Sequence, residues 1–318
     1  MNTSQVQKRL TQCDLCGGSD FVEISDRDRK GEELHTGVCQ SCGLVAHMPV
    51  PSEAEVAEYY AEHYRRDYHG EQTPSSRRIM RAWRNGERIL TVLFPYLGKG
   101  ARVFEVGAGI GCTVKAFEFQ GFAASGIEPN KDFNAFTRGQ LYASVDNLNL
   151  YDLPVEPTYD AVLLIHVIEH FCSPTKALNH IHGLLNQGGY FYVECPNLAA
   201  PFATFNRLFH YAHIYNFTPA TLVALAKKCG FELVKEFTDQ SSPDIHMLFR
   251  RVDVKVLEVD AAEADRSKVA VSRYNMLTYH IRPAYILRRI SKVFSYLTEY
   301  LLAGVFVKGL LARCNSKK

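Results

Sequence analysis

A short apolar run that ends in three glycines is the feature that most limits the folds open to this chain of 318 residues. Residues 101–106 have the pattern of a β-strand, the loop Gly107–Gly111 follows, and residues 113–120 have a helical pattern. Glycines at such a turn let the backbone reverse sharply and approach a ligand closely. Their GxGxG spacing differs from the GxGxxG loop of dinucleotide-binding proteins. The loop therefore predicts a ligand site of another kind at the edge of a sheet.

The alternation of strand and helix patterns continues to residue 252. Further strands are expected at 123–127, 144–150, 159–166 and 190–194, helices at 174–185 and 218–229, and a closing strand pair at 231–237 and 245–252. The run at 159–166 is almost entirely apolar, which is typical of a strand that is buried on both faces. Strands that alternate with helices predict an α/β fold with a doubly wound sheet.

Two carboxylates accompany the glycine loop. Glu105 stands two residues before the first glycine, and Glu128 ends the next expected strand, 21 residues after Gly107. A carboxylate in the second position can accept hydrogen bonds from both hydroxyls of a ribose. A glycine loop alone also occurs in ordinary strand-to-helix turns, so these two acids are what favour a ligand site.

Four stretches, in this order, resemble the class I S-adenosylmethionine-dependent methyltransferases: Glu105–Gly111, Glu128, Asn149–Pro154 and Tyr159–His170. The resemblance covers about residues 100–252. It implies a Rossmann-like sheet of seven strands, of which the last is antiparallel. It also implies S-adenosyl-L-methionine as the cofactor, with these residues around it: Glu105, Gly107, Gly109, Gly111, Glu128, Asn149, Leu150 and His166.

The resemblance gives each part of the cofactor an expected place. The glycine loop would hold the methionine part, Glu128 the ribose, and Asn149 and Leu150 would flank the adenine. Asn149 departs from the family pattern, because an aspartate is usual there. A neutral amide can still serve the adenine amino group through its carbonyl, so we expect binding that is weakened but not abolished.

Two CxxC pairs near the N-terminus predict a metal site. Cys13 and Cys16 form one pair, Cys39 and Cys42 form the other, and 22 residues separate the pairs. Four thiolates at this spacing can surround Zn²⁺ as a closed tetrahedral site, which is structural and not catalytic. A redox function for the pairs is disfavoured, because there are two of them and no thioredoxin-like βαβ pattern surrounds them. A region this small would take its folding energy from the metal.

Three of the twelve histidines are candidate catalytic residues. His166 ends the expected strand at 159–166, at the carboxyl edge where such sheets bind ligands. His170 lies four residues later, and His213 lies in a loop rich in polar aromatic residues. Histidine suits a proton-accepting role because its ordinary pKa lies near neutrality. For His170, packing or capping remains the alternative.

The charge of the chain is unevenly distributed. Residues 266–318 carry eleven Lys and Arg and a single acid, Glu299, for a net charge of +10, whereas residues 1–265 carry a net charge of −8. The tail is also apolar, but Glu299 and Lys308 interrupt its longest apolar stretch, so a transmembrane helix is not expected. Two alternatives stay open for the tail: it contacts an anionic membrane surface, or it packs on the acidic body or on a second subunit.

Four segments are expected from these patterns: a zinc ribbon at 1–50, a helical linker or cap at 51–99, a methyltransferase domain at 100–252 and a basic helical extension at 253–318. The N-terminus lacks the apolar region of a secretory signal, and the cysteines suit a reducing compartment, so a cytoplasmic protein is expected, with peripheral contact at the inner membrane face as an alternative.

The order of ribbon, helical segment and methyltransferase domain resembles a bacterial group that modifies sugars and other small metabolites. The sequence thus predicts methyl transfer to a small polar acceptor such as a sugar or sugar conjugate. An RNA methyltransferase and a non-catalytic cofactor-binding module are the alternatives. Residues 13–42 hold seven acids against three bases, and an acidic ribbon repels phosphates, so nucleic acid is disfavoured as a partner. Assembly into a homo-oligomer is left open.

Overall fold

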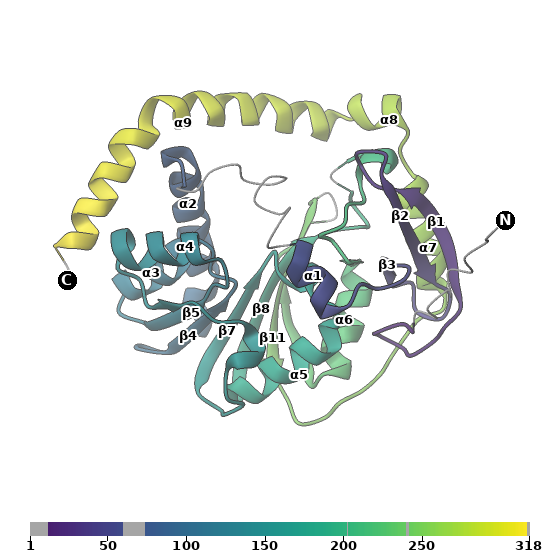
Figure 1. Ribbon diagram of the computed structural model, residues 1–318, viewed down its shortest axis with the longest axis horizontal. Coiled ribbons are helices and arrows are strands. Elements are labelled where there is room, and N and C mark those ends of the chain that lie inside the picture. Colours follow the sequence, from purple (N-terminus) through teal and green to yellow (C-terminus); the bar gives the residue numbers. More distant parts are fainter. Residues whose placement is uncertain (1–11, 60–73, 202, 240–241, 317–318) are drawn as a thin grey trace.

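The computed structural model describes residues 12–59, 74–201, 203–239 and 242–316, which form two sheets with helices around them (Figure 1). The larger sheet has seven strands in the order β10-β11-β8-β7-β4-β5-β6. Its strands are β4 (Arg102–Val106), β5 (Ala123–Ile127), β6 (Val145–Asp146), β7 (Tyr159–Ile165), β8 (Leu185–Pro196), β10 (Phe231–Glu236) and β11 (Asp244–Arg251). Strand β11 runs antiparallel to both of its neighbours, β10 and β8, and the other six strands run in one direction. The predicted seven-stranded sheet with an antiparallel last strand is confirmed.

Helices cover both faces of this sheet. The helices over the chain are α1 (Glu53–Tyr59), α2 (Ser76–Leu93), α3 (Cys112–Phe119), α4 (Lys131–Phe136), α5 (Pro174–Leu184), α6 (Pro219–Lys228), α7 (Ala262–Ser272), α8 (Met276–His280) and α9 (Pro283–Asn315). Alternate residues of β7 point to opposite faces, as the pleat of a strand requires. Val162 and Leu164 pack with α5 and α6, whereas Ala161 and Leu163 pack with α2 and α3. The central strands are therefore buried on both sides.

The smaller sheet has the order β1-β2-β3-β9 and carries the cysteine pairs at its edge. Its strands are β1 (Phe21–Arg27), β2 (Glu33–Cys39), β3 (Val45–His47) and β9 (Tyr215–Asn216). The fourth strand comes from far along the chain: Tyr215 pairs with Ala46, and Asn216 with Val45. The expected segments 1–50 and 100–252 thus share this sheet.

One strand is shorter than predicted. The expected strand at 144–150 is reduced to β6, and Leu150–Asp152 form a turn of 3-10 helix instead. The reason is local hydrogen bonding by asparagine, which competes with strand pairing. The side chain of Asn147 donates to the carbonyls of Glu128 and Pro129, and Asn149 is the N-cap of the 3-10 turn. The sequence pattern of residues 144–150 predicts a strand because it gives no sign of these competing hydrogen bonds.

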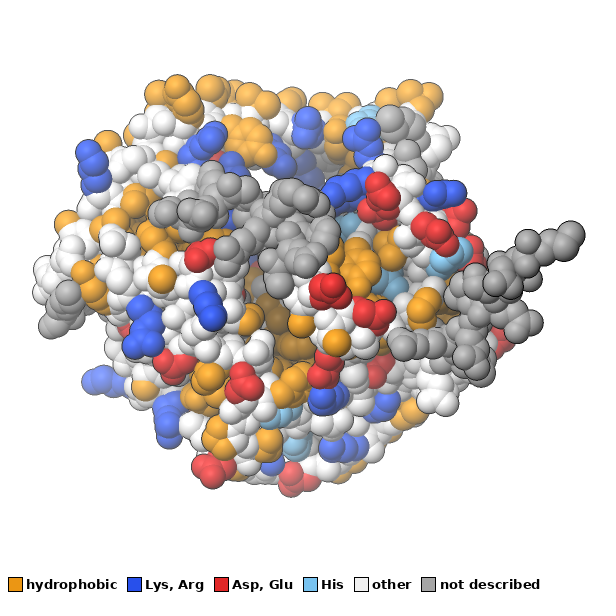
Figure 2. All heavy atoms as spheres, in the orientation of Figure 1, with side chains coloured by type: hydrophobic (Ala, Val, Ile, Leu, Met, Phe, Trp, Pro, Cys, Tyr) orange, Lys and Arg blue, Asp and Glu red, His pale blue; other side chains and the backbone are white. Residues whose placement is uncertain are grey.

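Helix α9 lies over the top of the molecule in Figure 1 and has two different halves. In its C-terminal half, Ala303, Val307 and Leu310 are buried and pack toward α2 and α3, and buried Glu299 pairs with Arg81 of α2. In its N-terminal half, large apolar side chains face outward, and Figure 2 shows them gathered along this edge. By length and composition alone, Tyr285–Asn315 could cross a membrane.

Candidate functional site

The glycine loop adopts the backbone conformation that only glycine takes without strain. Gly107, Gly109 and Gly111 have φ of 72°, 54° and 74°. A Cβ on Gly111 would collide with the methyl group of Thr137 at 2.2 Å, whereas a Cβ on Gly109 would meet nothing within 4 Å. The loop is therefore tightly supported from below by α4 and its continuation, and is open above Gly109. This open cradle is where a ligand can approach the backbone.

Both predicted carboxylates lie at this loop and are buried. Glu128 accepts hydrogen bonds from the amides of Gly109 at 2.8 Å and Asn130 at 2.7 Å, which leaves further lone pairs on both oxygens. Burial raises the pKa of Glu128, and burial raises that of Glu105 to about 8. Oε2 of Glu105 is buried and lacks a hydrogen-bond partner. Acceptors of this kind fit the hydroxyl and amino groups of S-adenosyl-L-methionine.

The two residues expected at the adenine differ in exposure. Leu150 is buried. Asn149 is exposed, and the nitrogen of its side-chain amide lies 3.4 Å from Asp152 Oδ2. Asn149 also receives support from its own backbone, because its N–H donates to Asp152 at 2.8 Å. The side-chain carbonyl of Asn149 is thus held at the surface near β6.

The three candidate histidines come together around one carboxylate. His166 Nδ1 lies 3.6 Å from Glu169 Oε1, His170 Nε2 lies 3.8 Å from it, and His213 Nε2 lies 3.9 Å from it. His166 follows β7 directly with φ of 54°, and its amide donates to the carbonyl of Glu194 at 2.8 Å. The turn after β7 therefore projects His166 away from the strand while Glu169 stays buried beneath it.

The histidines differ in exposure and in protonation. The side chain of His166 is 44% exposed, against 17% for His170 and 14% for His213. Burial by itself would lower the pKa of His166, but the neighbouring Glu169 raises it to about 9. Burial, with the charges of His210 and His170, lowers the pKa of His213 well below its ordinary value. Among these three, His166 is the one that a bound molecule can reach most easily.

Glu169 is the residue that the sequence patterns did not single out. Its carboxylate is 1% exposed, and neither of its oxygens has a hydrogen-bond partner among the residues that the structure describes. Burial would raise its pKa, but the charges of His170 and His166 lower it below the ordinary value. In the sequence, the signal for Glu169 is the pair Glu169-His170 soon after a buried strand. The fold is needed to bring His213 close to the same carboxylate.

The four cysteines of the CxxC pairs lie close together at the edge of the smaller sheet. Their sulfur atoms lie within 4.8 Å of one another, with Cys13 and Cys42 at 3.4 Å and Cys16 and Cys39 at 3.5 Å. Sulfur ligands of a tetrahedral zinc ion stand about 3.8 Å apart, because each Zn–S bond is about 2.3 Å long. The amide of Gly18 also donates to the sulfur of Cys16 at 3.4 Å. Burial, donor type and spacing all fit structural zinc.

The cysteine knuckle is hydrogen-bonded to the larger sheet's helices. Asp14, between the first two cysteines, accepts from the hydroxyl of Ser173 at 2.6 Å and from the amide of Thr175 at 2.7 Å, both at the start of α5. Its carbonyl accepts from Lys228 at the end of α6. On β3, His47 lies 3.2 Å from the carbonyl of Tyr211, two residues before His213. The ribbon therefore supports the loop that carries a candidate catalytic residue.

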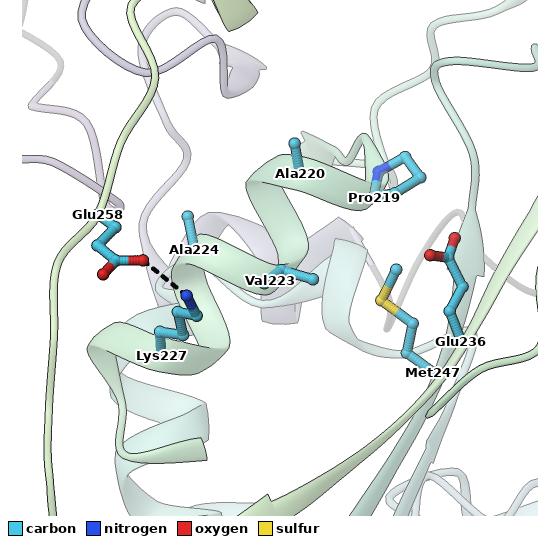
Figure 3. A pocket seen from close by; sticks show the side chains of 8 residues that line it. All are labelled: Pro219, Ala220, Val223, Ala224, Lys227, Glu236, Met247 and Glu258. Atoms are coloured by element: carbon cyan, nitrogen blue, oxygen red, sulfur yellow. Dashed lines mark hydrogen bonds and ion pairs between the residues drawn. The ribbon is translucent and has the colours of Figure 1, made fainter. Parts of the chain in front are cut away.

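A hollow of about 330 Å³ lies beside α6, and Figure 3 shows the side chains that line it. Small apolar side chains such as Ala220 and Val223 line it, with an ion pair between Lys227 and Glu258 at 2.6 Å along one side. None of the predicted site residues lines it. The chemistry of the chain is concentrated at the carboxyl edge of the large sheet, so this hollow is not the candidate site.

Residues 75–236 match the family model described as "Methyltransferase domain", which covers half of the chain. The chain belongs to the methyltransferase-domain family. An uncharacterized methyltransferase of Alkaliphilus oremlandii (strain OhILAs) is 30% identical over 94 residues. The match takes in 29% of this chain and only 44% of that relative's length.

Solved methyltransferase structures resemble the domain. A putative S-adenosylmethionine dependent methyltransferase from Listeria monocytogenes has a TM-score of 0.45 at 16% identity, covering 53% of this chain and 99% of that one. The 1,6-didemethyltoxoflavin-N1-methyltransferase from Burkholderia thailandensis has a TM-score of 0.49 at 20% identity, covering 69% of this chain and 96% of that one.

Proposed function

We propose that this chain transfers a methyl group from S-adenosyl-L-methionine to a small polar acceptor, a sugar or sugar conjugate. The observation that carries the proposal is the open glycine cradle, with the buried carboxylates of Glu105 and Glu128 beside it, in a chain of the methyltransferase-domain family. When bound, the cofactor supplies an electrophilic methyl group on a sulfonium. The residues of the chain hold it, orient the acceptor in line with it and exclude water.

Each group at the sheet edge has a task in this proposal. Glu128 accepts hydrogen bonds from the ribose, and Glu105 provides a buried acceptor below the loop. His166, the most exposed histidine, contacts the acceptor and takes the proton that a hydroxyl loses on methylation, with Glu169 orienting its ring. His170 and His213 pack behind this pair and act as positioning residues.

Two features support a small polar acceptor. Histidines and tyrosines, which donate and accept hydrogen bonds, are concentrated between β7 and β9. The ribbon beside them is acidic, with seven acids against three bases in residues 13–42, which disfavours the RNA alternative. The glycines and both acids of the cofactor site are present, which disfavours a non-catalytic binding module.

Release of S-adenosylhomocysteine across a panel of nucleotide sugars, lipid-linked glycans and RNA tests this function. We expect release with a sugar acceptor and none with RNA. Glu128→Ala should weaken cofactor binding about ten- to a hundredfold, because a charged hydrogen-bond acceptor to a buried ligand typically contributes about 1.5–3 kcal/mol. Calorimetry with S-adenosylhomocysteine measures this loss. Wild-type affinity in the variant would contradict the assignment of Glu128, and release only with RNA would contradict the sugar acceptor.

We further propose that the exposed apolar face of α9 places this cytoplasmic enzyme on the inner face of the membrane. Leu287, Phe294 and Leu301 recur at seven-residue spacing on the helix and are 66%, 65% and 71% exposed. Arg288 and Arg289 lie on the same helix, so an apolar stripe stands beside positive charge. This combination is typical of helices that lie on anionic lipid. On the opposite face of the helix, Ala303, Val307 and Leu310 are buried and belong to the core of the protein.

Co-sedimentation with liposomes tests the membrane contact. The full chain should sediment with anionic liposomes at low salt and be released at high salt, since such attraction is screened beyond the Debye length. The triple variant L287S/F294S/L301S should stay in the supernatant, and it should remain folded because all three side chains are exposed. If the wild-type chain also stays in the supernatant, the membrane proposal fails. A dimer that the triple variant disrupts would then assign the stripe to a second subunit.

A further inference from the structure

Near His166, three residues each direct one atom that could bind a metal toward the same buried position. Hydrogen bonds between these atoms do not explain the arrangement. The atoms belong to Glu169, His170 and His213 and lie within 4.8 Å of one another. Glu169 Oε1 is 3.8 Å from His170 Nε2 and 3.9 Å from His213 Nε2. These distances are too long for hydrogen bonds. Burying a carboxylate is costly, and His166 approaches Glu169 at 3.6 Å on one side only, so a cation between Glu169, His170 and His213 would stabilise it on the other side.

The ring of His170 is oriented with Nε2 toward this carboxylate. Its Nδ1 lies 2.6 Å from the carbonyl oxygen of Ala212. A carbonyl only accepts hydrogen bonds, so Nδ1 carries the hydrogen, and Nε2 is the ring nitrogen that faces Glu169. Histidines that bind metals commonly donate their other ring N–H to a backbone carbonyl in this way, which fixes the tautomer.

The spacing also suits an ion between the three groups. Nitrogen and oxygen ligands of a tetrahedral ion with bonds of about 2.0–2.2 Å stand about 3.3–3.6 Å apart. A small inward movement of the two imidazoles would bring their distances to Glu169 into that range. Within the described part of the chain, neither oxygen of Glu169 has a hydrogen-bond partner, and Nδ1 of His213 also has none.

We propose that Glu169, His170 and His213 form a second metal site, which binds one divalent transition-metal ion through one carboxylate and two imidazoles. This donor set is one that Zn²⁺ and its neighbours in the first transition row accept. Three protein ligands leave a coordination position for water or an acceptor oxygen, in contrast to the closed cysteine site. Binding of the ion does not depend on the proposed methyl transfer, so the two can be tested separately.

Cobalt titration of the full chain, stripped of metal with a chelator, tests the proposal. The cysteine site should bind Co²⁺ with strong sulfur-to-metal charge-transfer absorption. A second equivalent should add only weak ligand-field bands, because its ligands are nitrogen and oxygen. Elemental analysis of the purified protein should likewise find two metal ions per chain. A single equivalent, with charge-transfer absorption alone, would overturn the second site and leave His166 as the partner of Glu169.

Glu169→Gln separates the second site from the first. The amide has nearly the same shape but no charge, so the second equivalent should bind more weakly by at least the 10–100-fold that outer partners of a metal typically contribute, while the charge-transfer bands stay unchanged. Glu23→Gln is the matched control, because Glu23 also contacts a histidine, His35, at 3.1 Å but lies exposed on β1. Equal binding of the second equivalent by Glu169→Gln and wild type would overturn the proposal.

Discussion

Replacing Cys39 with serine is expected to release zinc, unfold the ribbon and abolish methyl transfer while cofactor binding survives. Zinc binding to four thiolates contributes about 10–16 kcal/mol of folding free energy in small zinc domains, and a serine hydroxyl does not replace a thiolate. The apolar core of the ribbon is small: Leu15, Leu44 and Ala46 pack with the cysteines against the helices of the larger sheet, and Val38 and Val45 form a second small cluster. Elemental analysis and circular dichroism measure the first two effects.

The loss of activity follows from how the ribbon is attached. Among the described strands, β9 pairs only with β3 of the ribbon, and His213 stands two residues before Tyr215, the first residue of β9. When the ribbon unfolds, the loop that carries His213 loses the strand that anchors it. The glycine loop is held by β4, β5 and α4, none of which the ribbon touches through strand pairing, so affinity for S-adenosylhomocysteine should be unchanged.

A matched variant, Cys314→Ser, controls for the loss of a buried thiol. Cys314 lies on α9 and packs with α2 and α3, far along the chain from the ribbon sheet. It should retain the wild-type zinc content and methyl transfer. Purified wild-type protein that is folded but contains no metal would refute the zinc assignment, and a folded ribbon in zinc-free Cys39→Ser would refute its structural role.

The larger sheet could be predicted because its signals are local. The glycine loop, the acids Glu105 and Glu128, and the apolar run of β7 each depend on residues that are neighbours in the sequence. Strand β6 could not be predicted at its true length, since Asn147 and Asn149 bond to backbone groups that only the folded turn brings close. The strand propensities of single residues do not account for such competing hydrogen bonds.

The site was less accessible to sequence reasoning than the fold. His166, His170 and His213 could be proposed one at a time from their positions beside expected strands. Their common partner, Glu169, is an ordinary acid in the sequence, and its role comes from burial and from the 43 residues that the chain travels before His213 returns to it. In the same way, two CxxC pairs predict a zinc site, but nothing in them indicates that β9 completes the ribbon sheet.

Replacing His166 with alanine is expected to reduce methyl transfer by about 10²–10⁴-fold, the usual cost of removing a general base. The prediction depends on position: of the three histidines around Glu169, His166 has by far the most exposed side chain. Glu169 favours the protonated ring of His166, the form that results when the acceptor gives up its proton. S-adenosyl-L-methionine held by the glycine loop would add a positive charge, and a like charge disfavours the protonated ring, so the bound cofactor would favour the neutral, proton-accepting form of His166.

Affinity for S-adenosylhomocysteine separates this effect from damage to the cofactor site. It should be the same in wild type and His166→Ala, since His166 belongs to the turn after β7 and not to the glycine loop. His166→Gln tells a proton acceptor from a group that only positions the substrate. Glutamine can still hydrogen-bond to an acceptor hydroxyl but cannot take its proton, so it should be as slow as alanine in single-turnover assays. A glutamine variant that kept most of the wild-type rate would make His166 a positioning residue, and the proton would then have to leave by another route.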